Sequence, residues 1–153
     1  MTRIRNSAKA IIRRDGCLLA IQKTDPQGGY YILPGGGQQY GEPLADTIRR
    51  EVKEETALDV KVGDVLFIRD YISSHHEFAG TEKDCHQVEF MFSCEIDTDG
   101  EARLGDTPDD GQIDVDWLPL DRLMDYRLYP LTLRPRLMNS TDDTRPVYLG
   151  DIN

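Results

Sequence analysis

The sequence is poor in several residue types, and each scarcity excludes a class of protein. Its three cysteines, Cys17, Cys85 and Cys94, are odd in number and lack metal-ligand spacing, so we expect buried reduced thiols rather than a disulfide framework or a zinc site. Only 18 basic residues stand against 28 acidic ones, which gives a formal net charge of −10. Because nucleic acids and anionic membranes would be repelled, general binding to either is not expected.

Long apolar runs are also missing. No stretch of about 18 or more apolar residues is present, and the amino-terminal segment MTRIRNSAKAIIRRDG lacks the apolar core and cleavage site of a signal peptide. We therefore expect a cytoplasmic protein with no membrane partner. The rest of the composition is globular, with 39% hydrophobic residues in a chain of 153, and this length fits one domain over residues 1–153.

Short aliphatic and β-branched segments predict a sheet around one helix. The segment AKAIIRRDGCLLAIQKT holds two such runs on either side of Asp15-Gly16, which is a strong hairpin signal. From Pro43 to about Thr56, apolar side chains recur at spacings of three and four, as in an amphipathic helix. Further strands are expected in LDVKVGDVLFIRDYI, HQVEFMFSCEI and QIDVDWLPL, with an edge strand in RPVYLGDIN. The pattern predicts an α/β fold with a mixed sheet.

The predicted helix carries an unusual density of carboxylates. Because an α-helix advances about 100° per residue, Glu51 and Glu55 share a narrow sector, and Glu54 lies roughly 60° to 100° from them. Three carboxylates so close repel one another unless a positive charge lies among them. Oxygen ligands at this density suit Mg²⁺ or Mn²⁺, and the glycine-rich loop before the helix can grip phosphates through its N–H groups. From the residues alone, a merely solvated acidic face remains the alternative.

The stretch LPGGGQQYGEPLADTIRREVKEETAL, residues 33–58, resembles the Nudix box of the Nudix hydrolases. That box reads Gly, five residues, Glu, seven residues, Arg-Glu, an aliphatic residue, any residue, Glu-Glu, any residue, Gly and an aliphatic residue. Ala57 stands where the family has glycine. Because alanine in a left-handed conformation costs roughly 1 kcal/mol, the backbone conformation at the carboxyl end of the helix is expected to differ from that of the family. The matching positions are Gly36, Glu42, Arg50, Glu51, Val52, Glu54, Glu55 and Leu58.

The resemblance implies a fold, a reaction and a set of ligands. The fold would be the α/β/α Nudix sandwich with a mixed sheet, and the reaction would be hydrolysis of a nucleoside diphosphate linked to another moiety, with Mg²⁺ or Mn²⁺ as cofactor. A homodimer is also compatible with the resemblance. The implied metal ligands are Glu51, Glu54, Glu55 and the Gly36 carbonyl.

Catalytic and bracing roles also follow from the resemblance. Glu51 or Glu54 would double as general base. Arg50 would orient a carboxylate through a forked hydrogen-bonded pair, the kind of contact for which a guanidinium is suited. Together with Glu42 it would brace the loop and the helix.

Residues outside the box leave alternatives open. Glu89 alternates with the apolar face of its predicted strand, so it either points into a cleft as a further acid or lies on a solvated face. Gln112 is a weak candidate for contact with substrate. Tyr30, Tyr31 and Tyr40 flank the glycine loop and would either stack on a base or pack against the sheet.

The sequence as a whole therefore predicts a pyrophosphohydrolase that requires Mg²⁺ and cleaves the diphosphate linkage of a small nucleotide or nucleoside diphosphate derivative. One alternative is a pyrophosphohydrolase acting on RNA 5′ ends, which the acidic charge and the lack of a basic stripe disfavour. Another is a sensor domain that binds a nucleotide without cleaving it. Such a protein usually lacks a box carboxylate or carries a DNA-binding segment, and this sequence shows neither.

Overall fold

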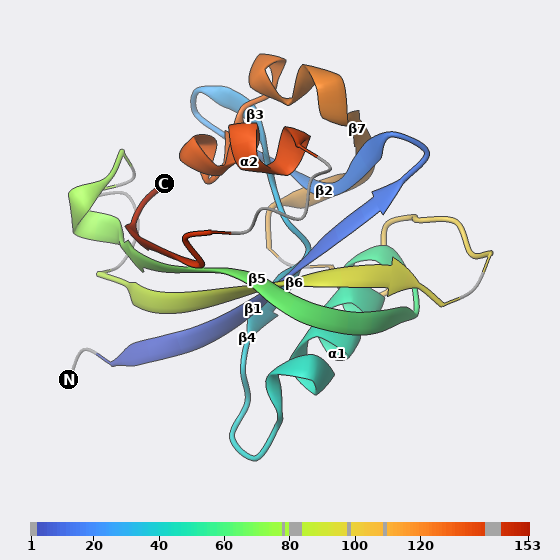
Figure 1. Cartoon of the computed structure of the whole chain (residues 1–153), viewed down its shortest axis with the longest axis horizontal. Coiled ribbons are helices and arrows are strands. Elements are labelled where there is room, and N and C mark those ends of the chain that lie inside the picture. The colour runs from blue at the N-terminus through green and yellow to red at the C-terminus, as the bar shows by residue number, and fades with distance from the viewer. Residues whose placement is uncertain (1–2, 78, 80–83, 98, 109, 140–144) are drawn as a thin grey trace.

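The computed structural model describes residues 3–77, 79, 84–97, 99–108, 110–139 and 145–153 (Figure 1). The predicted hairpin, the long helix and the edge strand near the end of the chain are all present. The strands are β1 (Ile4–Arg14), β2 (Cys17–Asp25), β3 (Gly28–Ile32), β4 (Gly35–Gly37), β5 (Val60–Ile72), β6 (His86–Ile96), β7 (Gln112–Pro119), β8 (Leu128–Tyr129) and β9 (Tyr148–Asp151). The helices are α1 (Leu44–Thr56), α2 (Arg134–Met138) and the 3₁₀ turns η1 (Ser73–His75), η2 (Leu120–Asp125) and η3 (Leu131–Leu133).

The strands form a mixed sheet in the order β8-β3-β2-β1-β6-β5-β9, with β4 paired to β1 and β7 paired to β2. Strand β1 is parallel to β6 and antiparallel to β2 and β4. The hairpin between β1 and β2 turns at Asp15 and Gly16, whose φ angles of 51° and 74° are those of a tight turn with two left-handed residues. The expected mixed α/β fold is therefore confirmed.

Two apolar clusters lie on opposite faces of this sheet. Because side chains alternate along a strand, Ile11 of β1 enters one cluster while Ile12 enters the other. Val52 of α1 packs into the second cluster, and Leu137 of α2 packs into the first. Figure 1 accordingly shows α1 and α2 on opposite sides of the crossing strands. This layering gives the α/β/α arrangement and fixes the face on which α1 can present its carboxylates.

Two expectations from composition can be checked in the described residues. Cys94 is buried, as predicted, but Cys17 and Cys85 are only half-buried, so the prediction of burial is wrong for these two cysteines. Burial raises the pKa of Cys94 to about 12, so this thiol stays protonated and behaves as a small apolar side chain. None of the helices formed by the described residues is long and apolar enough to cross a membrane.

Strand β9 is attached to the sheet through Asp151. Its carboxylate lies 2.7 Å from His75 Nδ1 and 2.7 Å from His76 Nε2, and it accepts the Ile72 N–H at 3.1 Å. Burial alone would raise the pKa of Asp151, but the hydrogen bonds from His76, His75 and Ile72 outweigh it and lower the pKa to about 2. The ionised carboxylate therefore stabilises the folded chain.

We expect the Asp151→Asn variant to be less stable than the wild type by about 1–2 kcal/mol at neutral pH, since hydrogen bonds to a 26% exposed carboxylate are lost. Asp151 has a lower pKa in the folded chain than the ordinary value of about 3.9, so its stabilisation is present above pH ~4 and lost as the pH falls toward 2. Urea unfolding between pH 3 and 7 measures the difference. The exposed Asp64→Asn is the matched control, and a difference independent of pH would contradict the prediction.

Candidate active site

Helix α1 presents its acidic residues at the border between the core and the glycine loop. Its apolar stripe is anchored by Ile48, which is completely buried. Glu51 and Glu55 lie one turn apart and are only 8% and 1% exposed, whereas the side chain of Glu54 is 38% exposed. This is the angular relation that the helical period predicts. Two carboxylates are therefore held against the protein and the third faces solvent.

The glycine loop touches both buried carboxylates. The Gly35 N–H donates a hydrogen bond to Glu55 Oε1 at 2.8 Å. A Cβ atom on Gly36 would lie 2.5 Å from the Glu51 carboxyl carbon, so only glycine allows this close approach. The Gly36 carbonyl accepts a hydrogen bond from Ser7 Oγ at 3.2 Å, and a carbonyl oxygen has a second lone pair for another partner.

Arg50 supplies a positive charge among these carboxylates. Its Nε and Nη2 donate to the two oxygens of Glu42 at 2.8 and 2.9 Å, which is the forked pair expected from the sequence. Its Nη1 donates to Glu51 Oε1 at 2.7 Å and lies 3.6 Å from Glu54 Oε2, and its Nη2 donates to the Gly37 carbonyl. The hydrogen bonds from Arg50 lower the pKa of Glu42 to about 2 and raise the pKa of Arg50. Loop and helix are thereby braced together.

The carboxylate and carbonyl oxygens of this site are chemically suited to a divalent cation. In the described part of the chain no three His, Cys, Asp or Glu side chains converge on one point as metal ligands, and Arg50 Nη1 instead lies near Glu51 and Glu54. Three carboxylates on adjacent turns and a backbone carbonyl beside one of them are nevertheless hard oxygen donors of the kind that Mg²⁺ and Mn²⁺ prefer. Glu54 has the exposure needed to turn toward such an ion.

Helix α1 ends at Ala57 in a left-handed conformation, with φ 64° and ψ 7°, and the Ala57 N–H donates to the Lys53 carbonyl. The expectation that alanine would change the backbone conformation at the carboxyl end of the helix is therefore wrong. Tertiary contacts with the last turn of α1 stabilise the left-handed conformation of Ala57 and offset the steric cost of its Cβ atom.

Those contacts come from Gln112, the first residue of β7, and from Gly105 in the segment before it. Gln112 is buried, and its Nε2 donates to the Glu55 carbonyl at 3.0 Å. The Gly105 N–H donates to the same carbonyl, and a Cβ atom on Gly105 would lie 1.8 Å from the Glu54 carbonyl oxygen. Gln112 thus holds the backbone of the acidic turn, and the contact with substrate for which the sequence made it a weak candidate stays a prediction.

We expect the Ala57→Gly variant to be more stable than the wild type by about 1 kcal/mol, because glycine adopts φ 64° without the steric cost that alanine has. Urea unfolding followed by the fluorescence of the single tryptophan measures this change. Ala45→Gly, inside the same helix, is the matched control and should destabilise by a similar amount. Destabilisation by both substitutions would contradict the prediction.

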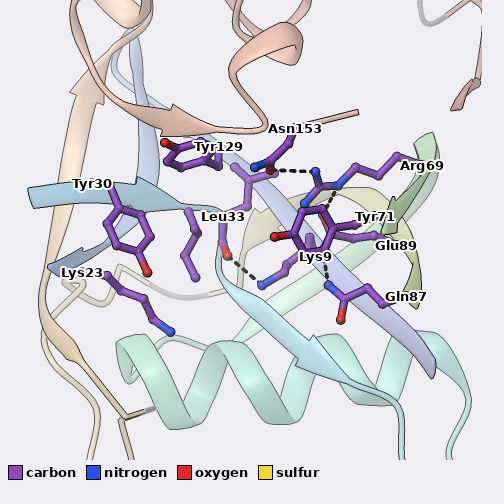
Figure 2. A pocket seen from close by; sticks show the side chains of 11 residues that line it. Lys9, Lys23, Tyr30, Leu33, Arg69, Tyr71, Gln87, Glu89, Tyr129 and Asn153 are labelled. Carbon is purple, nitrogen blue, oxygen red and sulfur yellow. Dashed lines mark hydrogen bonds and ion pairs between the residues drawn. The ribbon is translucent and has the colours of Figure 1, made fainter. Parts of the chain in front are cut away.

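A pocket of about 160 Å³ opens beside the glycine loop. It is lined by residues from six strands and from the carboxyl-terminal segment (Figure 2). Tyr30, one of the tyrosines proposed from the sequence, lies in its wall, but Tyr31 donates a hydrogen bond to Asp116 and Tyr40 is fully exposed. Tyr71 and Tyr129 also line the pocket. They were not predicted as site residues, because no local pattern distinguishes them from other strand residues.

Glu89 is 2% exposed and lines this pocket, so the alternative of a solvated strand face is wrong. Its oxygens accept hydrogen bonds from Arg69 Nε and Gln87 Nε2, both at 3.0 Å. Burial would raise the pKa of Glu89, but the charges of Arg69 and Lys9 and these hydrogen bonds lower it. Glu89 pairs across the sheet with Ser7, which contacts Gly36, so it lies on the side of the pocket near the glycine loop.

Comparison with known proteins identifies the family to which the chain belongs. Residues 3–137 match the sequence model of the NUDIX domain. The chain belongs to the Nudix family. Strand β4, helix α1 and the loop between them, which carry Gly36, Glu42, Arg50 and the three glutamates, are its Nudix box.

Individual relatives agree with this assignment. The nucleoside triphosphatase NudI of Salmonella schwarzengrund is 30% identical over 89 residues, which cover 55% of this chain and 63% of that protein. The crystal structure of a MutT NUDIX hydrolase from Burkholderia pseudomallei is 26% identical, with a TM-score of 0.68 over 91% of this chain and 99% of that one. An ADP-ribose pyrophosphatase from Streptococcus suis, at 22% identity and a TM-score of 0.59, shares the Nudix fold over 93% of this chain and 87% of its own.

Proposed function

We propose that this chain is an Mg²⁺-dependent pyrophosphohydrolase that cleaves the diphosphate linkage of a small nucleotide or nucleoside diphosphate derivative. The observation that carries the proposal is the contact of Glu51 and Glu55 with Gly36 and Gly35, which places carboxylates and loop N–H groups side by side. The names of relatives support the same chemistry, since a nucleoside triphosphatase and an ADP-ribose pyrophosphatase both act on phosphoanhydrides.

In this proposal Glu51, Glu54, Glu55 and the Gly36 carbonyl hold Mg²⁺, with Mn²⁺ as a substitute. The bound ion would supply Lewis acidity toward the phosphoryl oxygens and promote ionisation of the attacking water. Glu54 is the better candidate for general base, because Glu51 is occupied by a 2.7 Å hydrogen bond from Arg50 whereas Glu54 lies 3.6 Å away and is exposed.

The proposed reaction joins the oxygen of water to phosphorus and breaks one phosphoanhydride bond. The water proton passes to the Glu54 carboxylate, and the electron pair of the broken bond leaves with the departing phosphate. Arg50, fixed by its forked pair with Glu42, keeps Glu51 oriented during this step. The pocket beside the loop is proposed to hold the nucleoside, with tyrosine rings as flat apolar surfaces.

The test is release of phosphate or pyrophosphate, with product identification, from nucleoside triphosphates, ADP-ribose, nucleotide sugars and dinucleoside polyphosphates. Each substrate is incubated with Mg²⁺, with Mn²⁺, with EDTA, and with the Glu54→Gln variant. We expect metal-dependent turnover of one substrate class that the variant loses. Tight nucleotide binding without turnover of any substrate would reject the hydrolase in favour of the sensor.

A further inference from the structure

Arg127 lies immediately before β8 and contacts two tyrosines that line the pocket, Tyr30 and Tyr129. Its Nε donates to the Tyr129 hydroxyl at 3.0 Å. Its guanidinium carbon lies 5.4 Å from the ring centroid of Tyr30 and 5.5 Å from that of Tyr129, distances at which a cation is attracted to an aromatic ring. The two rings meet edge to face, with centroids 5.7 Å apart and planes at 81°. Arg127 therefore joins the two rings into one unit.

The guanidinium group is itself held by a forked ion pair. Arg127 Nη1 donates to Asp25 Oδ1 at 3.0 Å, and Nη2 donates to Asp25 Oδ2 at 2.7 Å. Asp25 Oδ1 also accepts the Gln27 N–H at 2.8 Å, so the turn between β2 and β3 fixes this carboxylate. The hydrogen bonds from Arg127 lower the pKa of Asp25, which keeps it ionised. Because two parallel hydrogen bonds to a carboxylate fix the plane of a guanidinium, the fork determines where Arg127 meets the rings.

The two sides of the pocket differ in chemistry. Figure 2 shows Tyr30 and Tyr129 on one side, with Arg69 and Gln87 on the other. A ligand that fits both sides needs a flat surface for the rings and polar groups for the side chains opposite. A nucleobase offers both, since each base has a π face and hydrogen-bonding edges. Such a ligand would lose affinity if the tyrosine rings turned away from their present orientation.

We propose that Arg127 is a positioning residue for base recognition: through its fork with Asp25 it fixes the ring pair of Tyr30 and Tyr129, on which the nucleobase of the substrate stacks. The inference rests on the proposed function and deepens it, because it assigns part of the affinity for substrate to this ring pair. Arg127 affects KM rather than kcat, since the base is bound equally before and during the chemical step. Purine and pyrimidine nucleotides both depend on it, because every base has a π face.

The first experiment measures binding without turnover. Isothermal titration calorimetry is performed in EDTA with AMP, UMP and ribose 5-phosphate, so that the probes differ in the presence and kind of the base. Arg127→Met keeps an unbranched side chain and removes the fork, the hydroxyl contact and the charge. We expect the dissociation constants of AMP and UMP to rise about tenfold, as for the loss of one stacking contact, and that of ribose 5-phosphate to stay unchanged. Arg127→Lys should recover only part of the affinity, because an ammonium group cannot form the fork.

Arg122→Met is the matched control, since it makes the same change in net charge at an arginine whose pair with Asp125 is exposed. Because Arg127 acts through the rings, Arg127→Met should have a smaller effect in a Tyr30→Leu background than in the wild type. Equal losses for AMP and ribose 5-phosphate would overturn the inference, as would equal losses in Arg122→Met or an undiminished effect in the Tyr30→Leu background. Thermal unfolding checks that each variant is folded, and Arg127→Lys provides the same comparison of probes if Arg127→Met is not.

Steady-state kinetics distinguish failure of this inference from failure of the proposed function. With the substrate found in the panel, KM should rise about tenfold in Arg127→Met while kcat stays close to that of the wild type. Unchanged KM would retain the hydrolase and reject the role of Arg127. Selective loss of AMP and UMP binding in a chain that turns over no substrate would retain that role and reject the hydrolase. Failure of the wild type to bind either nucleotide would reject the role of Arg127.

Discussion

The Glu51→Gln variant is expected to keep the fold and lose about 10²- to 10⁴-fold of kcat, because a well-held metal ion contributes several kcal/mol of transition-state stabilisation. Glu51 approaches Gly36 so closely that a Cβ atom there would lie 2.5 Å from its carboxyl carbon, and it accepts the 2.7 Å hydrogen bond from Arg50. The amide of Gln fills the same space, but it removes one negative charge from the proposed metal site. Steady-state hydrolysis of the substrate found in the panel, at saturating Mg²⁺, measures the loss.

Two controls separate chemistry from folding. Glu95→Gln removes an exposed carboxylate from β6 and should leave kcat unchanged. The concentration of Mg²⁺ needed for half-maximal rate should rise in Glu51→Gln, because a charged ligand has been lost. Similar thermal unfolding of Glu51→Gln and the wild type would show that the fold is intact. Wild-type kcat and an unchanged Mg²⁺ requirement in the variant would reject the role of Glu51.

Arg69→Met is expected to have the largest effect on stability, a loss of about 3–5 kcal/mol in the free energy of unfolding. Arg69 is buried, donates to Glu89 Oε1 at 3.0 Å, and also donates to the Ile152 carbonyl at 2.6 Å. Without Arg69, the 2% exposed Glu89 carboxylate would have lost its main counter-charge. Urea unfolding at pH 7 measures the change.

A double-mutant cycle tests whether the loss of stability comes from the Glu89 carboxylate, which stays buried without its partner. The Arg69→Met/Glu89→Gln variant should be more stable than Arg69→Met alone, because no ionised carboxylate is left without its partner. In Arg69→Met the pKa of Glu89 should rise through burial, so the stability deficit should shrink as the pH is lowered. Strict additivity of the two substitutions, together with a deficit independent of pH, would contradict this account.

The Nudix box shows how far local sequence determines a site. Periodicity predicted the helix, and it placed Glu51 and Glu55 in one sector with Glu54 beside them, because the angular relation of residues on a helix depends only on their spacing. A forked pair of Arg50 with a carboxylate was also predicted from sequence, and the structure identifies Glu42 as that carboxylate. In each case the relevant residues lie within a short segment whose backbone geometry is regular.

The surroundings of the box depended on strand pairing, which the sequence pattern did not reveal. Alternation along β6 left two orientations open for Glu89, and only the neighbouring strands made its face a buried pocket with Arg69 opposite. Gln112 reaches the Glu55 carbonyl across 57 positions of sequence. Such contacts arise from which strands are adjacent and in which register, and a single strand carries no information about its neighbours.

The sequence by itself determined the family motif, the acidic helix and the tight hairpin, because each depends on spacing within one segment. Tertiary structure alone decided that Ala57 adopts a left-handed conformation, that Glu89 is buried, and that Arg127 contacts Tyr30 and Tyr129. The physical reason is that burial, electrostatic partners and backbone strain are properties of the packed sheet and helices, where residues distant in sequence share one face.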